Sequence, residues 1–224
     1  MTRTYIGIDA EMTGTDYTKH KLIQIGLSID PRTPRKNFVA DVGWPAGTYQ
    51  YDPESLRVIQ WEHDRITAGA AAYDVETDLL AWLEEMGVKE KSIIPVGFAV
   101  RTFDMPFIHV TFPRIIKYFV RPAPRGLPSD HNPYIYRCCD LTDYTLALGV
   151  KPDPTVKRKK DAWSFDGWKR AGKRYAEAEL RRLGETTTWH DALFDAKAAM
   201  LHLEFYNNYR VQPNPKEMEA LLGQ

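Results

Sequence analysis

Asp9 and Glu11 stand two residues apart within residues 5–14, which have the sequence YIGIDAEMTG. Apolar Ile6 and Ile8 alternate with polar or small residues, and this period of two predicts a β-strand. Side chains two residues apart in a strand project from one face, about 6.5–7 Å from each other. Carboxylates this close repel, and burying either one is costly unless a positive group lies between them. A divalent cation that prefers oxygen ligands, such as Mg²⁺, would satisfy the pair, whereas an exposed acidic strand end would need no ion.

Asp104 follows a short apolar run, Ser92–Phe98, which is bounded by residues that break regular structure. Such a run is typical of a buried strand, and Asp104 would then lie at the start of the next helix. In α/β proteins, ligands bind at the edge of the sheet formed by the carboxyl ends of the strands. The position suits a site residue, and it also suits an aspartate that only caps a helix.

A histidine and an aspartate, His190 and Asp195, occur in residues 188–199, with the sequence TWHDALFDAKAA. Thr188 and Asp191 resemble a capping box that opens a helix, so we expect His190 in the first turn and Asp195 farther along. Five residues correspond to about 140° of helix rotation, so the two would flank a cleft rather than stack on one face. The alanines around Asp195 would allow this helix to lie close to a sheet, and a purely structural histidine remains the alternative.

The elements that must position these groups follow from hydrophobic period and turn residues. Early strands separated by turns predict an antiparallel start, and strands alternating with helices predict a mixed sheet flanked by helices, an α/β fold. The expected strands after the first are Lys21–Ile29, Lys36–Val42, Ser92–Phe98 and Tyr134–Asp140. The expected helices are short ones within Pro53–Gly69, then Tyr73–Met86, Asp104–Val120 and one through Leu148, with a loop over Arg121–Pro133.

The segment Lys151–Arg182 is basic, with 11 lysines and arginines against 5 acidic residues, a balance of +6. The run Lys157–Lys160 precedes three aromatic residues, Trp163, Phe165 and Trp168. Basic residues interleaved with aromatic ones fit a surface that neutralises phosphates and stacks bases. A solvated helix with aromatic anchors in the core would show the same pattern.

Composition excludes some classes of protein. The 224 residues fit one domain, and a hydrophobic content of 43% with six tryptophans provides for a sizeable core. No stretch approaches the roughly 18 consecutive apolar residues of a membrane span. The formal net charge of zero gives no overall field for a polyanion. The adjacent cysteines Cys138 and Cys139 are unsuited to a mutual disulfide, and no signal peptide opens the sequence, so we expect a cytoplasmic protein.

Together, the acidic pair, an aspartate about 90 residues on and a His-x₄-Asp about 90 further resemble the DEDDh group of 3′–5′ exonucleases, the DnaQ-like family. The resemblance covers roughly residues 4–207, and its sharpest parts are residues 8–14 and 190–196. The Glu-Met-Thr-Gly turn at residues 11–14 is similar to that of oligoribonucleases, which favours RNA. Many relatives carry a polar His-Asn pair where this chain has Phe98 and Ala99. The basic segment also looks longer than in minimal members, and could set substrate choice or cover the site.

The resemblance implies an RNase H-like mixed sheet in a domain over residues 1–210, with a C-terminal tail over 211–224. It implies a pair of Mg²⁺ or Mn²⁺ ions, with Asp9 bridging them, and His190 as the general base that takes a proton from the attacking water. The implied metal ligands are Asp9, Glu11, Asp104 and Asp195. Met12, Thr13 and Gly14 would lie beside the terminal nucleotide. The implied activity is 3′–5′ exoribonuclease cleavage of single strands, releasing nucleoside 5′-monophosphates.

Other functions remain open. The same five residues would serve a DNA 3′–5′ exonuclease of repair or proofreading, and a nucleic-acid-binding module could retain the fold without turnover. A serine hydrolase is disfavoured because no G-x-S-x-G turn occurs. A homodimer is possible, since Phe205, Tyr206 and Tyr209 would offer exposed aromatic surface to a partner.

Overall fold

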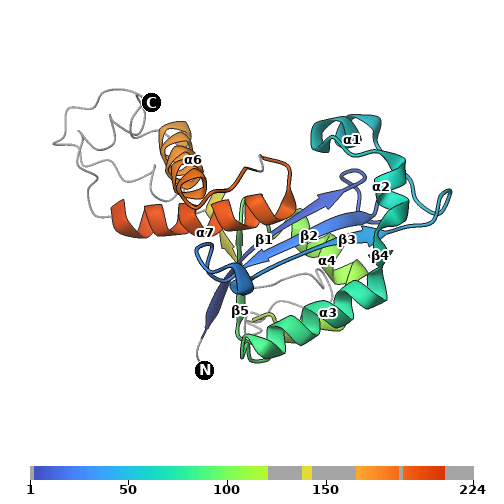
Figure 1. The fold of residues 1–224 in the computed structure, drawn as a ribbon, viewed down its shortest axis with the longest axis horizontal. Coiled ribbons are helices and arrows are strands. Elements are labelled where there is room, and N and C mark those ends of the chain that lie inside the picture. Colours follow the sequence, from blue (N-terminus) through green and yellow to red (C-terminus); the bar gives the residue numbers. More distant parts are fainter. Residues whose placement is uncertain (1–2, 121–137, 143–164, 187–188, 210–224) are drawn as a thin grey trace, which may run out of the picture.

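The computed structural model describes residues 3–120, 138–142, 165–186 and 189–209. In this part of the chain, six strands form a mixed sheet in the order β4-β3-β2-β1-β5-β6. Helices lie on both faces of the sheet: α7 and α6 on one, α3 and α4 on the other (Figure 1). The predicted α/β architecture, a mixed sheet flanked by helices, is confirmed.

The first three strands are β1 (Thr4–Met12), β2 (Leu22–Ser28) and β3 (Asn37–Gly43). They pair antiparallel, as predicted. The strand β5 (Ile93–Gly97) then pairs with β1 in parallel, so β1 lies between an antiparallel and a parallel neighbour. Two short strands extend the sheet, β4 (Ala70–Ala71) beside β3 and β6 (Cys139–Asp140) beside β5.

The period of two in β1 separates its faces as the sequence predicts. Ile6, Ile8 and Ala10 are buried in the main core, together with residues of β2, α3 and α4. Gly7, Asp9 and Glu11 lie on the other face, beneath α7. The strand is therefore covered on both sides, and its two carboxylates enter a space that a helix roofs.

Short helices α1 (Pro53–Ile59) and α2 (His63–Ala68) follow β3, and α3 (Ala72–Glu85) matches the predicted amphipathic helix. The helix expected over Asp104–Val120 is shorter than predicted: α4 covers Asp104–Thr111, and a separate 3₁₀ turn covers Ile115–Tyr118. Pro113 explains the break, because proline disfavours helical backbone in the residue before it and cannot supply a helical N–H.

The C-terminal helices are α6 (Phe165–Arg182) and α7 (Ala192–Tyr209), which pack against each other. α7 lies very close to the sheet. A Cβ on Gly7 would stand 2.1 Å from the carbonyl oxygen of Ala196, and one on Gly26 would stand 2.2 Å from the backbone of Ala192. Glycines on the strands and alanines on the helix thus bring α7 onto β1 and β2.

The predicted aromatic partner surface is wrong for two of its three residues. Phe205 and Tyr206 are fully buried, at 0% exposure, between α6, α7 and the sheet. They point inward because α7 presents this face to α6 and β5. The side chain of Tyr209 lies outside the described residues, and the homodimer stays a prediction.

Several predicted features fall outside the described residues. They are the loop over 121–133, the first part of the strand predicted over 134–140, the helix predicted through Leu148, the basic run 157–160 with Trp163, and the tail 211–224. Across the described ranges, no helix combines the length and apolarity needed to cross a membrane. Cys138 and Cys139 are free thiols, as expected for adjacent cysteines.

Candidate active site

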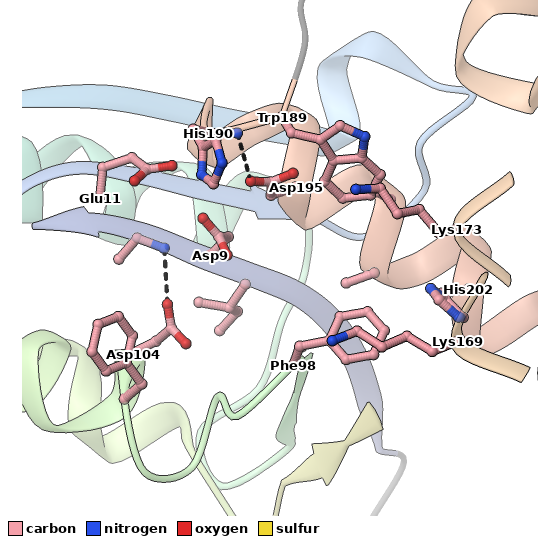
Figure 2. A pocket seen from close by; sticks show the side chains of 16 residues that line it. Asp9, Glu11, Phe98, Asp104, Lys169, Lys173, Trp189, His190, Asp195 and His202 are labelled. Carbon is pink, nitrogen blue, oxygen red and sulfur yellow. Dashed lines mark hydrogen bonds between the residues drawn. The ribbon is translucent and has the colours of Figure 1, made fainter. Parts of the chain in front are cut away.

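The end of β1 and the start of α7 bring the predicted acidic residues together. Asp9 and Glu11 point from β1 towards the first turn of α7, where Asp195 points back at them (Figure 2). Glu11 is buried and Asp9 is half-buried. Residues nearly two hundred positions apart thus share one space, because α7 lies directly over the face of β1 that carries the two carboxylates.

Asp104 reaches the same space from the first residue of α4. One of its carboxylate oxygens, Oδ1, accepts a hydrogen bond from the backbone N–H of Ala10 at 3.0 Å. This residue of β1 lies between Asp9 and Glu11, so the contact ties α4 to the centre of the acidic strand end. Asp104 is therefore more than a helix-terminal residue, because it binds the backbone of the strand that carries Asp9 and Glu11.

His190 lies next to Asp195, but not in the helix position that the sequence predicts. α7 begins only at Ala192, and Asp191 caps it by accepting the backbone N–H of Phe194 at 3.0 Å. His190 precedes the helix in a left-handed conformation, with φ 70°, and its backbone N–H donates to Asp195 Oδ2 at 3.0 Å. The expected first-turn position is wrong because Asp191 takes the capping role; Thr188 lies outside the described residues.

The carboxylates of Asp9, Glu11, Asp104 and Asp195, called here the acidic group, fit a divalent cation. Ligand atoms of Glu11, His190 and Asp195 all lie within 4.8 Å of one another. Asp195 Oδ1 is buried and has no hydrogen-bond partner within the described ranges, which is costly for a carboxylate oxygen unless a cation or proton reaches it. Carboxylate oxygens are the ligands that Mg²⁺ and related ions prefer.

The raised pKa values of these carboxylates also indicate a cation site. Burial, followed by repulsion from Asp195 and Asp104, raises the pKa of Glu11 to about 8. Burial raises the pKa of Asp104 to about 7, against the hydrogen bond from Ala10, and that of Asp195 to about 7, against the bond from His190. Burial and the surrounding carboxylates raise the pKa of Asp9 well above its usual range. The group is short of positive charge, which protons or metal ions would supply.

These side chains line one cavity of about 380 Å³, near the lower end of the size range of small-molecule sites. Aromatic and basic residues complete it on the side away from Glu11 (Figure 2). They are Phe98, Lys169, Lys173, Trp189 and His202, and Phe103, next in the chain to Asp104, lines the cavity as well. The basic segment identified in the sequence thus supplies two lysines to the site through α6.

The structure adds three residues to the site, of which the sequence indicates only Asp191, and that as a helix cap. Asp140, at the end of β6, accepts the backbone N–H of Ala99 at 3.2 Å and helps to raise the pKa of Asp104. Asp191 adds negative charge beside Asp195. His202 is buried on α7, where burial lowers its pKa to about 3. A strand-end aspartate and a cap are readable patterns, whereas the inward direction of His202 depends on the rotation of α7.

Met12, Thr13 and Gly14, predicted beside the terminal nucleotide, do not line this cavity. Met12 belongs to the main core. The Thr13 hydroxyl donates to the carbonyl of Gln50 at 2.6 Å and accepts the backbone N–H of Lys21 at 2.9 Å. These hydrogen bonds of Thr13 hold the turn in place directly after Glu11. A role for the turn in binding a nucleotide stays a prediction.

No protein-family model matches this sequence, and no curated protein sequence matches it either. Solved structures with the same architecture are nevertheless found. The chain is similar to Escherichia coli exonuclease I in a zinc-bound complex with single-stranded DNA, with TM-score 0.57 and 16% identity over 95% of this chain and 42% of that one. It is also similar to Schizosaccharomyces pombe Pop2p in a form with Mg²⁺ and Mn²⁺, with TM-score 0.58 and 15% identity over 92% and 84%.

A third similar structure is cell-death related nuclease 4, with TM-score 0.55 and 12% identity over 92% of this chain and 64% of that one. The chain spans less than half the length of the exonuclease I chains that it matches. At these identities the likeness concerns the fold. The chain has the RNase H-like α/β fold of these structures.

Proposed function

We propose that this protein is a metal-dependent 3′–5′ exonuclease that removes nucleoside 5′-monophosphates from single strands, with RNA as the favoured substrate. The single observation that carries the proposal is the convergence of four carboxylates and one histidine on a single cavity. Asp9, Glu11, Asp104 and Asp195 come from three separate elements, and His190 from the turn before α7. Metal-assisted phosphodiester hydrolysis is the chemistry that such a set serves best.

The four carboxylates would hold two Mg²⁺ or Mn²⁺ ions, and Asp9, which each of the other three carboxylates repels, would be one of the ligands. When bound, such ions neutralise phosphate charge and make water a stronger nucleophile. The protein's own contribution is to keep the carboxylates close together despite their repulsion. Glycine and alanine contacts under α7 and the Ala10–Asp104 hydrogen bond provide that rigidity.

His190 would accept the proton of the attacking water. Its side chain is exposed and stands beside Glu11 and Asp195, at the mouth of the acidic group (Figure 2). An imidazole can take up and release a proton near neutral pH, which suits a general base. His190 stands before α7 rather than within it, and Asp195 of the first turn holds its backbone.

An open cavity of about 380 Å³ suits a flexible single strand better than a continuous duplex. Among the structures with this fold, one is a complex with single-stranded DNA and another carries Mg²⁺ and Mn²⁺. These observations support a single strand and divalent ions. The preference for RNA rests on the oligoribonuclease-like turn at residues 11–14, and a DNA exonuclease of repair or proofreading is the second candidate.

The decisive experiment is digestion of 5′-labelled single- and double-stranded RNA and DNA, and of dinucleotides, with Mg²⁺, with Mn²⁺ and with EDTA. We expect a ladder that shortens from the 3′ end, 5′-monophosphate products and no cleavage in EDTA. Faster cleavage of DNA would select the second candidate. Binding without any cleavage, in every metal, would instead favour a nucleic-acid-binding module.

Asp104→Asn is the matched control for contaminating nucleases. The amide keeps an oxygen for the N–H of Ala10 while removing the negative charge, so the fold is expected to survive without activity. Cleavage at the wild-type rate by this variant would show that the site is assigned wrongly.

A further inference from the structure

Two lysines of α6, Lys169 and Lys173, face the cavity from one side of the helix. They are four residues apart, so their side chains share a face and lie about 6 Å apart along the helix axis. Both are exposed, and both line the same cavity as the carboxylates. Arg170, next in the chain to Lys169, is also exposed but does not line the cavity.

Each lysine covers an aromatic ring from a different element. The ammonium of Lys169 stands 5.4 Å from the ring centre of Phe98, which follows β5. The ammonium of Lys173 stands 4.0 Å from the ring of Trp189, which precedes α7. Both rings are half-buried and border the cavity. One helix therefore presents two lysine–aromatic pairs, one turn apart, beside the acidic group.

Other side chains hold the two rings in place. The ring of Phe98 meets the buried imidazole of His202 edge to face at 4.8 Å. The indole N–H of Trp189 donates to Glu177 at 2.5 Å, and its ring meets Phe194 at 5.3 Å. Rings fixed in this way are pre-organised, so a flat ligand that stacks on them orders little of the protein.

A lysine beside an aromatic ring matches the two parts of a nucleotide. The ring offers a stacking surface for a base, worth about 1–3 kcal/mol per base, and the ammonium neutralises a phosphate. A base arriving on the ring would displace the ammonium, and the long side chain of Lys169 or Lys173 can then turn to the backbone. The axial spacing of one helical turn is comparable with the separation of successive phosphates in an extended single strand.

We propose that Lys169 with Phe98 and Lys173 with Trp189 form two consecutive nucleotide subsites for the single strand upstream of the scissile phosphate. This inference rests on the proposed function. The terminal nucleotide is proposed on the Glu11 side of the acidic group, and the two pairs lie on the opposite side, past Asp195 (Figure 2). The strand would therefore run from Glu11 past Lys173 and on to Lys169.

The proposal accounts for the aromatic residue Phe98, which stands where many DEDDh relatives have a polar residue. An aromatic ring binds any base, because every base has a stacking face, and so confers little sequence preference. The competing interpretation is structural: the two pairs would serve only to dock α6 on the rest of the molecule. The two interpretations differ in what happens to strand binding and its salt dependence.

Binding is measured by fluorescence anisotropy of labelled oligo(U) and oligo(dT) at several salt concentrations, in an Asp104→Asn background with Mg²⁺. Lys169→Ala and Lys173→Ala are each expected to weaken binding and to lower the slope of log affinity against log salt by about 0.7. Phe98→Leu and Trp189→Leu should weaken binding about 5- to 150-fold, the equivalent of one lost stacked base. Arg170→Ala, which removes an equal charge from the same helix, is the matched control and should leave the slope unchanged.

Cleavage rates of otherwise wild-type protein on di-, tri- and tetranucleotides separate this inference from the proposed function. In the wild type, we expect kcat/KM to rise from the dinucleotide to the trinucleotide, which reaches Lys169 and Phe98, and to change little from the trinucleotide to the tetranucleotide. The gain from two to three nucleotides should shrink in the Lys169→Ala and Phe98→Leu variants. Equal loss with Arg170→Ala, or an unchanged salt slope in both lysine variants, would overturn the subsites. Cleavage of the dinucleotide by wild-type protein would still uphold the exonuclease in that case.

Discussion

The carboxylate of Asp195 accepts the backbone N–H of His190 at 3.0 Å, five residues before it in the chain. One oxygen of Asp195 thus fixes the histidine in its left-handed conformation, and the other remains buried without a partner in the described part of the protein. The five-residue spacing lets the carboxylate of Asp195 bind the backbone of His190. The same carboxylate faces the acidic group and holds the candidate base.

Because the two oxygens of Asp195 have different roles, two substitutions at this residue should have different outcomes. Asp195→Asn keeps an oxygen for His190 but removes a negative charge, so the fold should be retained while activity falls by at least about 10²-fold. Asp195→Ala should also free the His190 backbone. Comparison of kcat and of proteolysis around residue 190 in the two variants checks this, and equal protease sensitivity would contradict it.

The left-handed backbone of His190 carries a cost that glycine would remove. A residue other than glycine pays about 1–2 kcal/mol there. His190→Gly and His190→Ala should both lose about 10²–10⁴-fold in rate, since both lack the imidazole. The glycine variant should nevertheless be more stable than the alanine variant, by about 1 kcal/mol. Urea unfolding of both measures this, and a more stable alanine variant would show that the turn is relaxed.

The raised pKa values predict how stability depends on pH in metal-free protein. The folded state holds the proton of Glu11 up to about pH 8, whereas the unfolded chain releases it near 4.5. Between these values the folded state binds more protons, so the free energy of unfolding falls as pH rises. Unfolding in EDTA should therefore be easier above pH 8 than near pH 5. Glu11→Gln should flatten this profile by more than about 1 kcal/mol, and superimposable profiles would refute the assignment.

Metal binding should oppose this loss of stability at high pH, because protons and cations compete for the same carboxylate oxygens. The increase in Tm on adding Mg²⁺ or Mn²⁺ is expected to be larger near pH 8 than near pH 6, with salt of equal ionic strength as the control. In Asp9→Asn, most of the increase should disappear. A metal-induced shift that is the same at both pH values would mean that the ions bind away from these carboxylates.

The close approach of α7 to β1 predicts that Gly7 tolerates no larger residue. A Cβ there would stand 2.1 Å from the carbonyl oxygen of Ala196, so Gly7→Ala should push the helix outward. We expect a loss of about 1–3 kcal/mol, together with reduced activity, since Asp195 moves away from Asp9. Val39→Ala, on an exposed strand position, is the control and should change neither property much.

The amino-acid sequence by itself determined which side chains could do chemistry. Asp9 and Glu11 share a strand face because of the period of two, and the breaks around Ser92–Phe98 locate Asp104 after a strand. Pro113 could also have been read as the end of α4. These are local properties, in which backbone geometry and turn residues dictate the outcome within a few positions.

Only the tertiary structure decided how distant groups meet. The Ala10–Asp104 hydrogen bond spans 94 positions, and the rotation of α7 determines that Phe205 and Tyr206 face inward. The pairing of Lys169 with Phe98 depends on where α6 docks. No local pattern encodes such contacts, because they arise when glycines, alanines and core side chains settle how closely a helix and a sheet can pack.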